Sequence, residues 1–199
     1  MAQHFALTSE ENVVLIVCLV WAFSEVVGGK LLPALRRRGT VNAVKARSDK
    51  GSRLVLWLSI FVSIVIAIFF GTNEITPLPD WFFYLGIVLM LAGIALRQWS
   101  IRVLGQFFST TVQVTSDQRI VTSGPYGVIR HPSYSGALLA LLGLGLSAKT
   151  WAGTLVITVL FGLVYGYRIS IEENLLKAEF GQEYADYAKK TKRLIPFLL

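Results

Sequence analysis

Histidine and cysteine are scarce in this sequence, and so are charged residues. The chain of 199 residues holds two histidines and one cysteine, Cys18. Because structural and catalytic metal sites need several such ligands, we expect no zinc or haem centre, and one cysteine gives no disulfide framework. Only 16% of the residues are charged and 54% are hydrophobic, with a mean hydropathy of +0.59. A water-soluble domain of this length cannot bury so much apolar side chain, so the composition indicates a membrane protein.

A net charge of +7 brings nucleic acid into consideration as a partner. The basic residues are separated by long apolar runs, however, and form no continuous stripe. A nucleic-acid-binding surface needs such a stripe or patch. We therefore expect no nucleic-acid partner.

Three apolar runs approach the ~20 residues that a helix needs to cross a bilayer. They are residues 13–32, 54–71 and 81–101. Two shorter runs, 134–147 and 151–167, lie three residues apart and predict a helical hairpin whose first helix need not cross fully. Small residues recur four apart in this pair, at 136 and 140, 143 and 147, and 162 and 166, which permits close helix packing. We thus predict an all-α polytopic fold with five transmembrane helices and a hairpin packed inside the protein.

Lysine and arginine lie almost entirely on one side of these spans. Seven occur within residues 36–53, three within 102–130 and six from Arg168 onward, which places sixteen of the nineteen together, whereas Lys149 lies opposite. Because cytoplasmic loops retain such residues, we expect a cytosolic C-terminus, an outer N-terminus and contact of the basic loop with anionic membrane lipid. The protein would then be a multi-pass protein of the cell (inner) membrane or the endoplasmic reticulum membrane.

Residues 102–132 are too polar to cross a membrane and predict a structured cytosolic loop. Residues 110–114 are extended in character, and residues 123–127 are a turn sequence. Pro132 suits the first turn of the next helix. This placement puts Arg130 and His131 beside the free N–H groups of that helix, which predicts a site for an anionic or polar ligand.

Residues 168–190 predict a further helix, of mixed character. Glu173 falls within an apolar stripe, and Arg168 and Glu172 lie one turn apart beside it. As a surface pair, Arg168 and Glu172 would contribute only ~0.2–0.5 kcal/mol. Ionisable residues near membrane depth are usually functional, however, and these converge with His131 and Tyr134 at one interface. We therefore expect a functional site there.

Several short motifs follow one another over nearly half of the chain. They are Val121-Thr-Ser-Gly-Pro-Tyr126, Arg130-His-Pro-Ser-Tyr134 with Gly136, Arg168, Glu172-Glu173, Leu176, Phe180-Gly181, Tyr184, Tyr187 and Arg193-Leu-Ile-Pro196. Through them, residues 105–199 resemble the isoprenylcysteine carboxyl methyltransferase family, while the first hundred residues match in span pattern only. We accordingly divide the chain into an N-terminal three-helix membrane region, residues 1–101, and a catalytic methyltransferase region, residues 102–199.

The resemblance implies that S-adenosylmethionine binds in the cytosolic C-terminal region and that the acceptor is a lipid-like or prenylated carboxylate. The residues implied around the cofactor are Gln113, Gln118, Arg119, Ile120, Val121, Tyr126, His131, Pro132, Ser133, Tyr134, Glu172 and Glu173, and the implied catalytic residues are Arg168, on the substrate side, and Glu172. Gln118 departs from the family, where a histidine can occur. Helical periodicity favours Glu173 as the more buried carboxylate, whereas the resemblance favours Glu172, so we place Glu172 first and keep Glu173 as the second candidate.

An ionised carboxylate needs little acid or base help, so positioning would carry most of the rate of its methylation.

Other functions remain open. The Arg-His-Pro-x-Tyr element also looks similar in phospholipid (amine) methyltransferases and in NADPH-dependent membrane reductases, and an inactive relative or a membrane scaffold is a further alternative. The Gly143-Leu-Gly145 sequence superficially resembles a dinucleotide loop, but it follows no strand and lies within an apolar helix.

Overall fold

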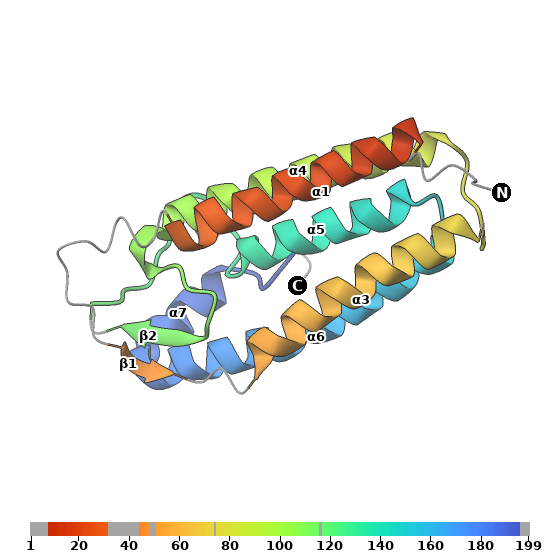
Figure 1. Cartoon of the computed structure of the whole chain (residues 1–199). Helices are drawn as coiled ribbons and strands as arrows, with labels where there is room; N and C mark the ends of the chain where they lie inside the picture. Colours follow the sequence, from red (N-terminus) through yellow and green to blue (C-terminus); the bar gives the residue numbers. More distant parts are fainter. Residues whose placement is uncertain (1–7, 32–43, 48–50, 74, 116, 196–199) are drawn as a thin grey trace.

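The computed structural model describes residues 8–31, 44–47, 51–73, 75–115 and 117–195. Five helices lie lengthwise beside one another and alternate in direction along the chain (Figure 1). They are α1 (Ser9–Val26), continued by the π-helical turn η1 (Val27–Leu31), α3 (Ser52–Thr72), α4 (Trp81–Leu104), α5 (Pro132–Ser147) and α6 (Trp151–Phe180). All five contribute to one buried apolar cluster, which includes Val17, Ala67, Met90, Leu141 and Phe161.

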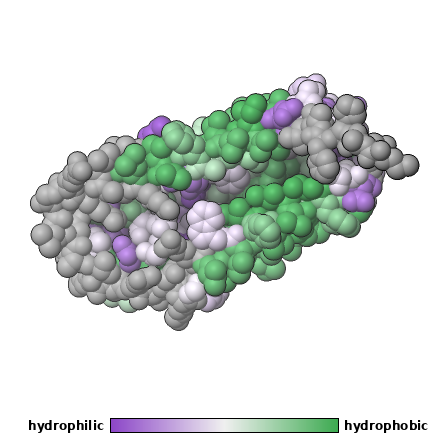
Figure 2. Space-filling view, in the orientation of Figure 1, coloured by the Kyte–Doolittle hydropathy of each residue, from purple (hydrophilic) through white to green (hydrophobic). Residues whose placement is uncertain are grey.

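Four of these helices are long and apolar enough to cross a membrane. These segments are Ser9–Gly29, Leu54–Thr72, Trp81–Phe107 and Trp151–Phe180, while α5 is shorter, with 16 residues. Their outward faces carry large uncovered apolar side chains such as Phe23, which is 71% exposed, Phe61 and Leu163, and the surface along them is hydrophobic (Figure 2). A soluble monomer rarely exposes so large an apolar surface. The chain is therefore a multi-pass integral membrane protein, with four long apolar helices and a shorter one at the positions of the five predicted spans.

The small residues of α5 pack against α4. A Cβ atom on Gly93 would meet the carbonyl oxygen of Gly136 at 2.5 Å, and one on Gly143 would meet that of Gly86 at the same distance. Such backbone contact requires glycine. By contrast, nothing among the described residues lies within 4 Å of a Cβ atom built on Gly162 or Gly166. The prediction that these two residues pack within the hairpin is wrong, because this face of α6 points away from the core.

Ionic and threonine contacts tie several elements together at one end of the bundle. Lys149, in the turn between α5 and α6, places its Nζ 2.8 Å from Glu10 Oε2 and 3.1 Å from Asp80 Oδ1. These hydrogen bonds raise the pKa of the Lys149 ammonium above its ordinary value. Thr150 in turn donates to the backbone carbonyl of Ile75. The starts of α1 and α4 therefore meet the hairpin turn, and the side of the membrane on which they lie stays a prediction.

The polar segments gather at the opposite end (Figure 1). Two short strands, β1 (Val44–Arg47) and β2 (Gln113–Thr115), pair antiparallel with Ala46 opposite Val114. β2 overlaps the segment 110–114, which was predicted to be extended, at residues 113 and 114. The pair forms a small sheet that the all-α prediction omitted. The 3-10 turns η2 (Gly105–Phe107) and η3 (Gly124–Gly127) precede and follow β2 in the chain, the second at the predicted turn. Most of the predicted basic loop, at 32–43 and 48–50, lies outside the described residues.

The C-terminal helix is broken where the sequence predicted continuity. Helix α6 runs without interruption past Tyr167 to Phe180, and Gly181, with a φ of 51°, ends it before α7 (Gln182–Lys190) begins. A single helix over residues 168–190 is therefore wrong, because the left-handed backbone at Gly181 changes the chain direction.

The segment after α7 lies along the loop that precedes α5. The backbone N–H groups of Arg130 and His131 donate to the carbonyl oxygens of Lys192 and Arg193 at 2.7 and 3.0 Å. Ser135 adds a hydrogen bond of 2.5 Å to the Leu194 carbonyl. Residues 192–194 are thereby brought to the first turn of α5. Pro196, which belongs to the last motif, lies outside the described residues.

Candidate functional site

A cavity of about 400 Å³ lies between α1, α3, α5, α6 and the loop that contains β2. This volume is within the range of small-molecule sites. Along α5 the wall changes from Ser133 and Tyr134 to Ala137 and Leu141, so one part is polar and the other, bounded by α1 and α3, is apolar. A hollow between the hydrophobic ridges of α1 and α3, with more hydrophilic residues on its floor, is visible on the surface (Figure 2).

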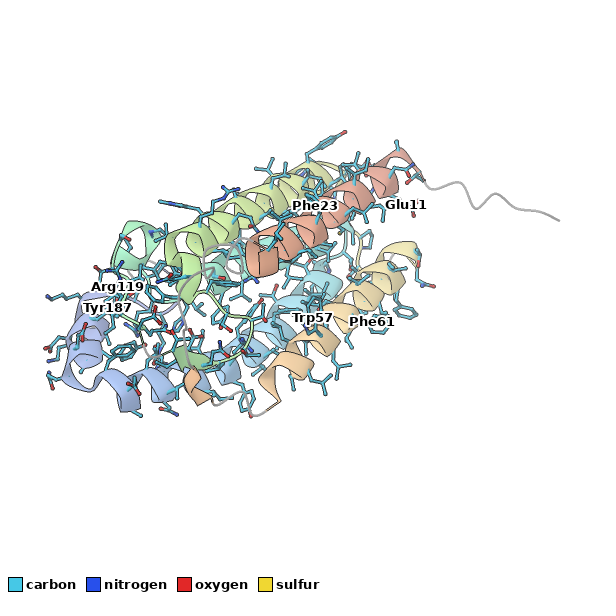
Figure 3. The ribbon with its side chains drawn as sticks, turned by 60° about the vertical axis from the view of Figure 1, so that its left-hand side comes forward. Glu11, Phe23, Trp57, Phe61, Arg119 and Tyr187 are labelled. Atoms are coloured by element: carbon cyan, nitrogen blue, oxygen red, sulfur yellow. The ribbon has the colours of Figure 1, made fainter. Side chains whose placement is uncertain are left out.

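The fold brings most of the predicted site residues to this one wall from four separate segments of the chain. Those on the wall are Gln113, Gln118, Arg119, Ile120, Val121, Tyr126, His131, Ser133, Tyr134, Arg168 and Glu172. The described wall includes neither Pro132 nor Glu173. Figure 3 shows Arg119 and Tyr187 together at this end of the molecule, away from Glu11. Whether the wall residues bind a ligand stays a prediction that the geometry makes possible.

Tyr134 links the two residues that were predicted to be catalytic. Its hydroxyl donates to Glu172 Oε2 at 2.7 Å and accepts a hydrogen bond from Arg168 Nε at 3.0 Å. Arg168 Nη2 also donates to the Thr110 carbonyl at 2.7 Å, and only 3% of Arg168 is exposed. The interpretation of Arg168 as part of a surface pair is therefore wrong. A buried guanidinium in a fixed position can hold an anion in one geometry.

Glu173, the second carboxylate candidate, belongs to a separate ionic network. Arg130 Nε lies 3.1 Å from Glu173 Oε1, and Arg193 Nη2 lies 3.0 Å from Oε2. Only 4% of the Glu173 side chain is exposed, against 32% of the Glu172 side chain. Helical periodicity thus identified Glu173 as the more buried residue. Its carboxylate, however, binds Arg130 and Arg193, which follows α7, within the protein. The carboxylate on the cavity wall is that of Glu172.

The predicted ligand site at the start of α5 has a different arrangement from the one expected. The Arg130 guanidinium is turned to Glu173 and donates to the Ala188 carbonyl at 2.8 Å and to that of Thr191. His131 Nε2 lies 3.4 Å from Glu173 Oε1, its Nδ1 lies 3.9 Å from Glu172 Oε2, and its ring stacks on that of Tyr134. Arg130 therefore lines the cavity with its guanidinium held by Glu173 and the chain after α7, while His131 lies between the two carboxylates.

Two tyrosines near α7 remain protonated hydrogen-bonding groups. Burial, reinforced by the nearby Glu172 carboxylate, raises the pKa of the Tyr126 phenol well above its ordinary value. Burial likewise raises the pKa of Tyr187 to about 12, and its hydroxyl donates to the Tyr126 carbonyl at 2.8 Å. Both side chains line the cavity. At neutral pH they offer hydrogen bonds and aromatic surface but no negative charge.

Three further residues on the wall, Glu25, Arg97 and Tyr184, had no predicted role in the site. Arg97 pairs with Glu25 through Nε and, at 2.7 Å, through Nη2. Arg97 lies within an apolar run, and a charge in such a run was the signal that could have identified it. The Tyr184 hydroxyl is buried and has no hydrogen-bond partner among the described residues. Nothing in the local sequence separates this tyrosine from a packing residue.

The helical bundle with its charged pocket has the fold of an intramembrane methyltransferase. It matches a solved structure of the eukaryotic intramembrane Ras methyltransferase ICMT, an isoprenylcysteine carboxyl methyltransferase, with a TM-score of 0.69 over 98% of this chain and 70% of that chain, at 23% sequence identity. The model of the phospholipid methyltransferase family matches residues 81–183. The chain belongs to this family of membrane methyltransferases, which includes the isoprenylcysteine methyltransferases.

Two proteins that are similar to this chain in sequence carry different names. A probable protein-S-isoprenylcysteine O-methyltransferase of Oryza sativa subsp. indica is 30% identical over 78% of this chain and 88% of its own length. The cobalt-zinc-cadmium resistance protein CzcN of Cupriavidus metallidurans is 31% identical over 73% of this chain and 64% of its own. In the part of the chain that the structure describes, no three His, Cys, Asp or Glu side chains are placed to hold a metal ion.

Proposed function

We propose that this protein transfers a methyl group from S-adenosylmethionine to the carboxylate of an isoprenylcysteine-like or other lipid-attached acceptor at the cytosolic membrane face. One observation carries the proposal. Tyr134, hydrogen-bonded to both Arg168 and Glu172, lies where the wall of a single cavity changes from polar to apolar. Such a site suits two ligands, one polar and one with an apolar tail.

The polar part of the cavity fits the cofactor. A buried tyrosine hydroxyl normally has a partner, so the unpartnered hydroxyl of Tyr184 on the wall supports a polar ligand there. The residues that would hold the cofactor are Gln113, Gln118, Arg119, Ile120, Val121, Tyr126, His131, Ser133, Tyr134 and Glu172, with Pro132 and Glu173 acting from behind the wall. When bound, S-adenosylmethionine supplies an electrophilic methyl group on a positively charged sulfur. Glu172 and the faces of Tyr126 and Tyr134 can balance such a charge.

The charges on the wall favour an anionic acceptor over an amine. The described wall carries four arginines, at 97, 119, 130 and 168, and two glutamates, at 25 and 172. Arg97 is paired with Glu25, and Arg130 is paired with Glu173 behind the wall, so Arg119 and Arg168 remain as the wall cations against the single carboxylate of Glu172. A carboxylate is ionised at neutral pH and can attack without a base, whereas an ammonium must first lose a proton. Both ring nitrogens of His131 lie toward carboxylates, Nε2 3.4 Å from Glu173 Oε1 and Nδ1 3.9 Å from Glu172 Oε2, so this histidine already has two partners in the protein. Arg168 can hold the carboxylate in line with the methyl group.

The apolar part of the cavity suits the lipid tail of the acceptor. Its wall comes from α1, through residues such as Trp21 and Ala22, and from α3, through Leu56, Ile60 and Ile64. The hollow between these helices opens on the face that meets the bilayer (Figure 2). An acceptor could therefore enter from the membrane, and a partly dry pocket would strengthen its contact with Arg168.

The proposal is tested on the protein purified in detergent and returned to lipid nanodiscs. Binding of S-adenosylmethionine and of NADPH is compared by calorimetry, and radiolabelled methyl transfer is measured to farnesylcysteine-like acids, small isoprenoid acids and phosphatidylethanolamine. We expect binding of S-adenosylmethionine and methylation of a prenylated acid. Methylation of the amine alone would instead support the phospholipid methyltransferase alternative that the family model suggests. Binding of NADPH alone would support a reductase, and binding of neither would support an inactive relative.

A further inference from the structure

An ion pair joins α1 to α4 beside the cavity, within two membrane-spanning helices that are mostly apolar. Arg97 contacts Glu25 through two nitrogens, Nε to Oε1 and Nη2 to Oε2, the second at 2.7 Å. The side chains are 12% and 25% exposed, and Trp21 Nε1 donates to Glu25 Oε1 at 3.3 Å. Burying two charges is costly, so such a pair rarely improves stability over an apolar contact. Stability alone therefore does not explain this pair.

The remaining donor of Arg97 reaches a third helix. Its Nη1 donates to the Ser133 carbonyl at 3.1 Å and to Ser133 Oγ at 2.9 Å, in the first turn of α5. The next residue is Tyr134, whose hydroxyl bridges Arg168 and Glu172 and whose ring stacks on Tyr165. A change in the position of Ser133 would move Tyr134 with it, because the two are adjacent in the same helical turn.

We propose that Arg97, oriented by Glu25, is a positioning residue for the methyl transfer. It fixes the first turn of α5 and, through Tyr134, the relative placement of Arg168 and Glu172. The proposal rests on the function proposed above. It also implies that α1, which forms one wall of the apolar part, is coupled to the charged part of the same cavity.

The alternative is that the pair only attaches α1. This helix has a second contact with α4, in which Gln98 Nε2 donates to Ser24 Oγ at 3.0 Å. Ser24 is not on the described cavity wall, and the contact joins the same two helices next to the ion pair. Ser24→Ala is therefore a matched control that weakens helix attachment and leaves the Arg97 contact with Ser133 in place.

The test compares Arg97→Gln, Glu25→Gln, the exchanged double variant Glu25→Arg with Arg97→Glu, and Ser24→Ala. Each is measured for Tm, cofactor affinity, kcat and KM, and each also carries 3-fluorotyrosine at position 134 as a fluorine NMR probe. Because a misplacement of about 1 Å can lower a rate by about 100-fold, we expect Arg97→Gln to lower kcat by about 10- to 100-fold and to shift the Tyr134 fluorine resonance. Glu25→Gln should have the same effects to a smaller degree, and Ser24→Ala should have neither.

The exchanged variant separates positioning from attachment. It restores an ion pair between α1 and α4, but a glutamate at position 97 cannot donate to the Ser133 carbonyl, so Tm should recover while kcat and the fluorine resonance do not. Recovery of kcat together with Tm would overturn the proposal, as would an equal loss of kcat in Ser24→Ala. Should Arg97→Gln fail to fold, Glu25→Gln carries the same comparison. If the wild type methylates none of the acceptors, the function proposed above fails, and an unchanged fluorine resonance in the Arg97 and Glu25 variants would separately refute the positioning role.

Discussion

Glu172 and Glu173 are adjacent in α6, yet their carboxylates lie in different environments. Glu172 accepts a hydrogen bond from Tyr134 on the cavity wall, whereas Glu173 is enclosed by Arg130, Arg193 and His131. Successive helical residues point about 100° apart, so one carboxylate is available to a ligand and its neighbour is engaged in the protein.

The same mutation at these two positions should therefore have separable effects. Glu172→Gln should weaken S-adenosylmethionine binding about tenfold or more, since losing a charge-assisted hydrogen bond costs about 1.5–3 kcal/mol, with little change in Tm. Glu173→Gln should lower stability by about 3–5 kcal/mol, because it leaves the buried Arg130 guanidinium without its charged partner. Calorimetric titration and denaturant unfolding measure the two effects. If the affinity falls only in Glu173→Gln, the choice between the carboxylates is wrong.

Arg168→Lys tests whether geometry or charge matters at the substrate side. Lysine keeps the positive charge but lacks the planar guanidinium. In the wild type, Arg168 Nε donates to the Tyr134 hydroxyl at 3.0 Å and Nη2 donates to the Thr110 carbonyl oxygen at 2.7 Å. The variant should bind S-adenosylmethionine nearly as the wild type does and have a kcat lower by about tenfold or more, since positioning dominates the rate. Full turnover of a carboxylate acceptor by this variant would exclude a role of Arg168 in holding the substrate.

Tyr184→Phe removes a hydroxyl that has no partner among the described residues. Burial raises the pKa of this phenol, so at neutral pH it is protonated and able to donate. We expect unchanged Tm without ligand and about 3- to 10-fold weaker cofactor binding, the effect of one neutral hydrogen bond.

Tyr187→Phe is the matched control for Tyr184→Phe, because its hydroxyl already donates to the Tyr126 carbonyl. It should lower the free energy of unfolding by about 1 kcal/mol and affect the cofactor less. A loss of Tm in unliganded Tyr184→Phe, with no change in affinity, would show that Tyr184 only packs.

Replacement of a glycine by alanine should have opposite effects on Tm in α5, at Gly143, and in α6, at Gly162. Gly143→Ala should destabilise the protein, since its Cβ atom would lie 2.5 Å from the Gly86 carbonyl oxygen, and overpacking costs about 1–3 kcal/mol or more. Gly162→Ala adds a methyl group in open space and should leave Tm unchanged or raised, because alanine favours helix. Thermal unfolding in detergent measures both. Equal Tm values for the two variants would contradict the interlocked packing of these helices.

Cysteine labelling tests the predicted orientation. In a Cys18→Ala background, Thr72→Cys lies at the bundle end that carries Lys149, and Gln182→Cys lies on α7 at the other end. A membrane-impermeant reagent applied outside the cell should label position 72 and leave position 182 unlabelled. The reverse pattern would show that the distribution of basic residues was misread.

The sequence by itself determined the apolar spans and most of the predicted residues that line the cavity. A bilayer of fixed thickness requires about 20 apolar residues per crossing, so the apolar runs could be located by counting. Short motifs that follow one another in a fixed order identified five of the wall residues. These are Tyr126, His131, Tyr134, Arg168 and Glu172.

Only the tertiary structure decided which of these side chains face one another. Arg97 and Glu25 are 72 residues apart, and no local pattern states that α1 lies against α4. The end of α6 depends on the backbone angle of Gly181, and the faces of Gly143 and Gly162 depend on which neighbour covers them. Helical periodicity reports that a residue is buried, but whether Glu173 is buried by a ligand or by Arg130 is set by contacts between segments far apart in the chain.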